Sequence, residues 1–196
     1  MFNAALGTIY DEHRSLAAVV QGLRFLVGRF RRDGVTPEFD LLRAMLRYLQ
    51  EFPARLHHPK EEAFLFSCLQ KRTREADALI AELFAEHNAE AALLQELAAA
   101  LEVFAGGQDG GATCFADVVD RYSGTVMRHL AREEHVLMPL ARRHLLPEDW
   151  VEIGVAFSEN GDPRFEADAE ADYAELFRRI LTLGGKHDAC GLGDPG

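Results

Sequence analysis

Two stretches of this chain share a pattern that constrains its fold more than any other feature. Each has a His four residues before the first Glu of a Glu-Glu pair and then an apolar run: residues 57–66 read HHPKEEAFLF and residues 129–138 read HLAREEHVLM. On an α-helix, positions i and i+4 lie on one face, about 6 Å apart along the axis. Burying an imidazole beside a carboxylate is costly unless something positive lies between them. The pattern therefore predicts metal ions held between helices.

The rest of the sequence predicts an all-α protein. Apolar residues recur at helical spacing in four long segments, which cover residues 3–32, 37–71, 74–104 and 112–144. The loops between them are short, and residues 106–111 (GGQDGG) are an unambiguous one. Four long amphipathic helices with short loops predict an antiparallel up-down four-helix bundle over residues 1–145.

A short C-terminal helical extension is expected to pack on the bundle over residues 146–184. A helix starting near residue 147 carries the only Trp, Trp150, which we expect to dock the extension onto the bundle. Residues 158–163 are predicted to form a turn, residues 164–183 a last helix, and residues 185–196 a flexible tail.

Two local features of the second helix can be predicted. Thr36 followed by Pro37 is a favourable N-cap and first-turn pair, so the helix is expected to begin there. Pro53 and Pro59 interrupt the helical pattern, and a kink is expected at these prolines.

The histidines form an internal repeat. His87 follows His13 by 74 residues, and His129 follows His57 by 72 residues. Glu133 likewise follows Glu61 by 72 residues. Two helical hairpins packed face to face would thus bring four imidazoles and two carboxylates into one cavity. The predicted metal ligands are His13, His57, Glu61, His87, His129 and Glu133.

The repeat also selects between two possible registers of the first motif. His58 and Glu62 have the same spacing as His57 and Glu61, but the residue that matches His58 in the second copy is Leu130. His58 and Glu62 also continue a polar row of the helix. We therefore expect His58 to face water, as we do His135 and His144.

Helical spacing predicts which residues of the third and fourth helices are buried. The third helix is expected to bury Ala76, Leu79, Ile80, Leu83, His87, Ala91, Leu94, Leu97 and Leu101. The fourth is expected to bury Phe115, Val118, Tyr122, Val126, His129, Glu133, Val136, Leu137 and Leu140.

The donor set favours iron. Imidazole nitrogen and carboxylate oxygen suit Fe, Mn and Zn, whereas Ca and Mg prefer shells of oxygen. We expect two non-haem Fe ions, each with two His, bridged by Glu61, Glu133 and an oxo or hydroxo group; Mn or Zn are possible substitutes. The neighbouring acidic residues would lie in solvent or orient the ligands: Glu12, Glu62, Glu86 and Glu134.

Charge and cysteine content limit the partners. The formal net charge of −11 argues against nucleic acid or an anionic membrane as a partner. The three cysteines are scattered, which favours a reducing compartment. The first residues lack a basic segment followed by an apolar one, so a cytoplasmic location is expected.

The order His, His-x-x-x-Glu, His, His-x-x-x-Glu resembles the hemerythrin-like HHE cation-binding family over residues 8–142. The resemblance implies that the six predicted residues are iron ligands. Oxygen-carrying hemerythrins place a further His where this chain has Ala91, and an Asp in the motif where it has Glu133. The chain is more similar to members with two Glu bridges, which are associated with iron sensing, peroxide or nitric-oxide handling, and repair of iron centres.

These observations favour a protein that binds or senses oxygen, nitric oxide or peroxide. A redox enzyme that detoxifies peroxide or nitric oxide is an alternative, and iron storage or donation is a third. A homodimer is possible, and a signalling role would require a protein partner.

Overall fold

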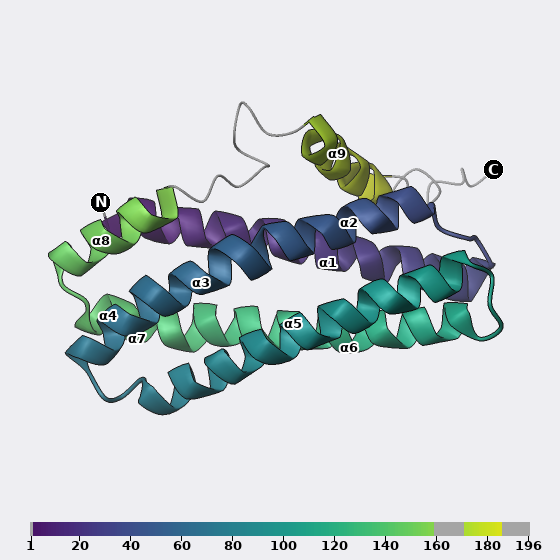
Figure 1. Ribbon diagram of the computed structural model, residues 1–196. Helices are drawn as coiled ribbons and strands as arrows, with labels where there is room; N and C mark the ends of the chain where they lie inside the picture. Colours follow the sequence, from purple (N-terminus) through teal and green to yellow (C-terminus); the bar gives the residue numbers. More distant parts are fainter. Residues whose placement is uncertain (1, 159–170, 186–196) are drawn as a thin grey trace, which may run out of the picture.

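The computed structural model describes residues 2–158 and 171–185, and every regular element in these ranges is a helix. The all-α prediction is confirmed. Four long helical segments lie lengthwise beside one another, each antiparallel to the one before it (Figure 1). The first segment is α1 (Phe2–Asp33), and the third is α5 (Asp77–Ala105).

The second and fourth segments each alternate between α-helix and π-helical turns, which are labelled η. The second contains α2 (Phe39–Glu51), η1 (Pro53–His57), α3 (His58–Lys60), η2 (Glu61–Phe66) and α4 (Ser67–Arg72). The fourth contains α6 (Gly111–Arg132), η3 (Glu133–Leu137) and α7 (Met138–His144). Both His-x-x-x-Glu motifs therefore run into a π turn that begins at the motif's own Glu.

The π turn at Pro53 lies where a kink is expected from the sequence. Proline has no amide hydrogen, so it cannot donate the usual bond to the preceding turn. The amides of Leu56 and His57 both donate to the carbonyl of Phe52, at 3.0 and 3.2 Å. The helix thus widens at the proline while the segment continues.

The π turn of the fourth segment changes which side chains face the interior. A π turn contains an extra residue, so the residues that follow it are rotated relative to an α-helix. Leu137 and Met138 are fully buried, whereas Val136 is 47% exposed. The prediction that Val136 is buried is wrong for this reason. In the second segment, Leu65 and Phe66 are the equivalent buried pair.

The start of α2 also differs from expectation. The helix begins at Phe39, and Glu38 occupies the N-cap position with an extended backbone and no capping hydrogen bond from its side chain. The prediction that Thr36 and Pro37 begin the helix is wrong; both residues lie in the connection from α1.

Two apolar clusters fill the space between the four segments, one toward each end. The first joins the second half of α1 to α2, to the second half of α5 and to α6. The second joins the start of α1 to α4, α7 and the first half of α5. Between the clusters, each of the four segments contributes a buried histidine. In chain order these are His13, His57, His87 and His129.

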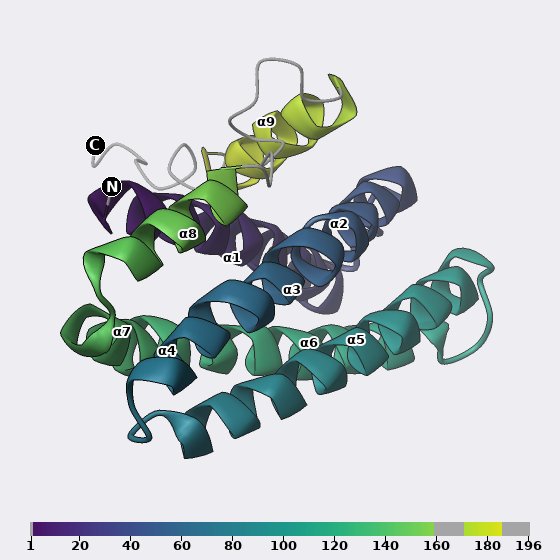
Figure 2. The same ribbon diagram turned by 60° about the vertical axis from the view of Figure 1, so that its left-hand side comes forward.

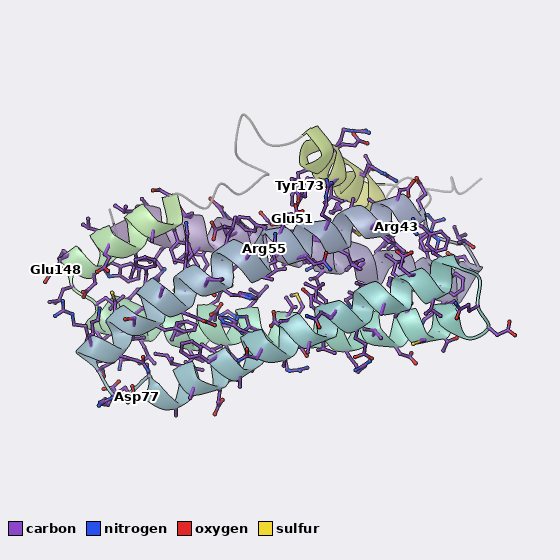
Figure 3. All side chains as sticks on the ribbon, viewed as in Figure 1. Arg43, Glu51, Arg55, Asp77, Glu148 and Tyr173 are labelled. Carbon is purple, nitrogen blue, oxygen red and sulfur yellow. The ribbon has the colours of Figure 1, made fainter. Side chains whose placement is uncertain are left out.

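Two shorter helices follow the fourth segment. Helix α8 (Pro147–Ser158) packs against α1, and Trp150 is buried in the second apolar cluster. Helix α9 (Ala171–Gly185) lies across α1 and α2 (Figure 2). Tyr173 of α9 donates a hydrogen bond to Glu51 at the end of α2, and the two side chains point toward one another in Figure 3.

Some expectations fall on residues that are not described. The predicted turn at residues 158–163, the first part of the predicted last helix and the predicted tail lie almost entirely outside the described ranges. Within those ranges, no helix combines the length and the apolar character that crossing a membrane requires.

Candidate metal centre

The six predicted ligands meet between the two apolar clusters, and all of them are buried. His13 comes from α1 and His87 from α5. The other four come from the second and fourth segments: His57 ends η1, Glu61 begins η2, Glu133 begins η3, and His129 lies in the last turn of α6.

The carboxylate of Glu61 faces imidazoles on two sides. Its Oε1 lies 3.3 Å from Nε2 of His57 and 3.5 Å from Nε2 of His13. Its Oε2 lies 3.6 Å from Nε2 of His87. A carboxylate whose two oxygens face different nitrogen donors would present one oxygen to each of two cations.

Glu133 also lies between imidazoles of the two halves of the repeat, but one of its oxygens, Oε2, faces both of them. Its Oε2 is 3.3 Å from Nε2 of His13 and 3.4 Å from Nε2 of His129. The Nε2 atoms of His87 and His129 are 3.2 Å apart. Two ligand atoms, each about 2.1 Å from one metal ion, are about 3–3.5 Å apart at tetrahedral or octahedral angles. The spacing of these donor atoms therefore fits metal coordination.

Six of the converging atoms are buried without a hydrogen-bond partner among the described residues. They are Nε2 of His13, Nε2 of His57 and both carboxylate oxygens of Glu61 and Glu133. Leaving a buried polar atom unpaired costs about 1–3 kcal/mol, and more for a charged group. Six such atoms gathered in one buried region would be strongly destabilising in the absence of a cation, so the residues fit a metal centre.

A ring of four glutamates holds the outer nitrogen of each imidazole. Each Nδ1 donates to a carboxylate on another segment: His57 to Glu12 at 2.6 Å, His87 to Glu62 at 2.7 Å, His129 to Glu86 at 3.1 Å and His13 to Glu134 at 3.1 Å. A proton held on Nδ1 leaves the lone pair of Nε2 directed at the centre, which is the usual arrangement for a metal-binding histidine. The sequence leaves open whether these glutamates lie in solvent or orient the ligands, and in the structure all four reach a predicted ligand.

The buried imidazoles and carboxylates of the site shift one another's pKa values. Burial opposes protonation of His57, yet Glu61 and Glu12 outweigh it and raise the pKa of His57 well above its usual value. His129 behaves in the same way, and Glu133 contributes most to raising its pKa to about 10. Burial alone would raise the pKa of Glu61, but His57 and His13 hold it well below its usual range.

The prediction that His58 faces water is wrong. Its side chain is buried and stacks on the ring of His87, with ring centroids 4.1 Å apart and planes 9° from parallel. The π turn that ends at His57 widens the helix, so neighbouring residues His57 and His58 both face the interior. Burial and the nearby imidazoles, that of His87 above all, lower the pKa of His58 well below its usual value, which keeps the ring neutral.

With His58 included, the donors form two groups that share one residue. Within each group the donor atoms lie within 4.8 Å of one another. The first group is His13, His57, Glu61 and Glu133, and the second is His58, Glu61, His87 and His129. The second group therefore has three imidazoles where two are expected from the repeat.

The family model of the hemerythrin HHE cation-binding domain matches residues 4–141. The chain belongs to this family. The match includes all six predicted ligands and His58, so the resemblance seen in the sequence is confirmed, and metal binding follows as a property of the domain. No match was found among curated protein sequences.

Glu90 is a residue of this hemerythrin domain that the sequence analysis missed. Its side chain is buried, and its Oε2 lies 3.9 Å from Nε2 of His58. Burial raises its pKa to about 7. Alternating steps of three and four residues along α5 would have revealed it, since they connect buried Ile80, Leu83, His87, Glu90, Leu94 and Leu97. The neighbouring Ala91, which is predicted to be buried, is exposed.

A pocket of ≈ 210 Å³ reaches the second donor group from the surface. It lies between the second segment and α5, and His58, His87 and Glu90 line it. Four further lining residues are exposed, which places them toward its mouth: Ala54, Pro59, Asn88 and Ala91. The remaining lining residues are Leu49, Pro53, Glu62, Leu94 and Tyr122.

Proposed function

We propose that this hemerythrin-family protein is a non-haem di-iron protein that binds or senses oxygen, nitric oxide or peroxide at the centre of a four-helix bundle. The observation that supports this most strongly is the pair of overlapping donor groups that share Glu61. Two groups of nitrogen and oxygen donors with a carboxylate between them suit two adjacent transition-metal ions and do not suit calcium or magnesium.

The protein's own residues would hold and shield such a centre. The imidazoles and the two central glutamates would bind the ions, and the outer ring of glutamates would fix the imidazole orientation. The apolar clusters on both sides exclude water along the axis of the bundle. When bound, iron supplies open coordination positions and reversible redox chemistry, while Mn or Zn would occupy the same donors as substitutes.

Metal content is the first test of this proposal. Protein purified without added metal should contain two irons per chain, one for each donor group. His57→Ala and His129→Ala should each lower the iron content, because each removes a donor. His135→Ala is the matched control, since His135 is an exposed histidine of η3 beside the centre. Full iron content in both ligand variants would show that the ligand assignment is wrong.

Reactivity then separates binding from catalysis. A ligand-binding protein should show a spectral change with nitric oxide or peroxide that ends when the centres are saturated. Continued consumption of peroxide long after that point would instead assign a redox enzyme. Transfer of iron to a metal-free acceptor protein faster than to a chelator would assign iron donation.

A further inference from the structure

The metal centre departs from its internal repeat at two positions on the same side. The repeat pairs His58 with Leu130 and Glu90 with Leu16. Both leucines are buried in the first apolar cluster. One half of the centre thus carries two buried polar side chains where the other half has hydrocarbon.

These two polar residues lie together and are incompletely paired. Nε2 of His58 lies 3.9 Å from Oε2 of Glu90, which is too long for a hydrogen bond. Nε2 of His58 and Oε1 of Glu90 have no hydrogen-bond partner among the described residues. Because unpaired buried polar atoms are costly, such a pair in a native protein calls for an explanation, such as a ligand or ion that the atoms contact.

The pocket that opens to the surface lies on the His58–Glu90 side of the centre. The pocket that contains His58, His87 and Glu90 has no lining residue from the first donor group. Its volume of ≈ 210 Å³ is several times the roughly 30 Å³ that a water molecule occupies in the liquid. A molecule of two to four atoms therefore fits inside it.

The charge of the lining indicates which molecules it favours. The residues that line the pocket include the acidic Glu62 and Glu90 and contain no Lys or Arg. At a pH above the pKa of about 7 of Glu90, this carboxyl is ionised, and a small cleft lined by acidic groups then disfavours anions and leaves neutral molecules unaffected. Dioxygen, nitric oxide and hydrogen peroxide are neutral, whereas azide is an anion.

We propose that small neutral ligands reach the metal centre through this pocket and bind on its His58–Glu90 side, where the carboxylate of Glu90 contacts the ligand and disfavours anions. The inference rests on the proposed function, because it requires a metal centre that binds exogenous ligands. It adds the side of the centre, the access route and the residue that selects among ligands.

A pair of tryptophan substitutions on α5 tests the access route. Ala91 and Ala92 are adjacent and exposed, but only Ala91 lines the pocket. Ala91→Trp should slow the association of nitric oxide with the iron-loaded protein by about tenfold, because the indole obstructs the mouth. Ala92→Trp should leave the rate unchanged, and both variants should keep their full iron content. If nitric oxide associates with both variants as fast as with the natural protein, the proposed access route is wrong.

Replacing Glu90 by leucine, the residue at the equivalent position of the repeat, tests whether Glu90 selects neutral ligands over anions. Glu90→Leu should bind azide about tenfold more tightly than the natural protein does, while its affinity for nitric oxide should change much less. Equal changes for both ligands, or no change, would overturn the role of Glu90. Tyr10→Phe, which alters a ring near His13 on the other side, should change neither affinity.

Failure of the proposed function and failure of the present inference give different experimental results. If the natural protein contains no iron, or if its spectrum does not respond to nitric oxide, both proposals are overturned. If the natural protein binds iron and nitric oxide but the α5 and Glu90 variants behave like it, the present inference alone is wrong.

Discussion

Glu12 and Glu86 occupy equivalent places in the two halves of the repeat, and each accepts a hydrogen bond from the outer nitrogen of a predicted ligand. Glu12→Gln and Glu86→Gln should each weaken iron binding by about 10–100-fold, because the amide loses the charge that orients and polarises the imidazole. Competition with a chelator would measure this effect.

The control for this pair is Glu102→Gln. Glu102 makes an exposed ion pair with Arg43, away from the centre. This variant should bind iron as the natural protein does. If the Glu12 and Glu86 variants bind iron as tightly as the natural protein does, the proposed role of the outer glutamates is wrong.

The protonation of His57 and His129 predicts how the metal-free protein responds to pH. Their pKa values are raised above the usual value of 6.5, to about 10 for His129, so the protonated forms stabilise the fold. This stabilisation is fully present below pH 6.5 and is lost as the pH rises toward 10.

Thermal unfolding at a series of pH values checks this prediction. The Tm of the metal-free protein should fall by several degrees across that range. The iron-loaded protein should show a smaller fall, because iron replaces the two protons. A Tm of the metal-free protein that does not change with pH would contradict the assignment of these protons.

The six repeated residues could be predicted because their spacing is visible in the sequence, whereas His58 and Glu90 could not be assigned in the same way. His58 has no counterpart in the second copy, and its burial depends on the π turn that ends at His57. Glu90 follows the buried spacing of α5, which could have revealed it, but it is one of several glutamates on that helix and the others are not buried.

At the scale of the elements, the long helical ranges follow from apolar spacing and from the glycine-rich loop, and the structure reproduces them closely. The π turns do not follow from that spacing, because α- and π-helix differ by one residue per turn and the sequence shows no insertion. The exposure of Val136 is the clearest consequence, since it follows from the extra residue in η3.

Helix α8 is fixed to the second segment by Asp149. Its carboxylate accepts hydrogen bonds from Nε and Nη2 of Arg72 at 2.8 and 2.9 Å, and from the amide of Leu146 at 2.8 Å. Asp149→Asn should destabilise the fold by about 1–2 kcal/mol, because it removes the charge from these bonds. Urea unfolding, followed by the fluorescence of Trp150, measures both the stability and the local packing.

Trp150 is a suitable reporter because it is the only Trp of the chain and is buried one residue after Asp149. Glu148→Gln is the matched control, since Glu148 is largely exposed and lies 3.6 Å from Arg72. It should change the stability by much less. Equal stability of the two variants would contradict the role of the Asp149 contacts.

At the scale of the whole molecule, the metal centre separates the two apolar clusters and therefore contributes to the stability of all four segments. Removing the metal should lower the Tm by about 10 °C or more, because a ligand present at a thousand times its Kd stabilises by about 4 kcal/mol. Circular dichroism of loaded and chelator-treated protein measures this difference. Adding Mn or Zn should recover part of it, and equal Tm values would contradict the structural role of the metal.

The outer hydrogen bonds also connect the four segments in a closed circuit. Each glutamate lies next in sequence to a predicted ligand on its own segment and holds a ligand on another: Glu12 on α1 holds His57, Glu62 in η2 holds His87, Glu86 on α5 holds His129, and Glu134 in η3 holds His13. If the centre holds iron as proposed, loss of an electron would make the coordinated imidazoles more acidic and would strengthen their hydrogen bonds to these carboxylates. A change in oxidation state would then reach every long helix at once, as a tightening around the whole circumference.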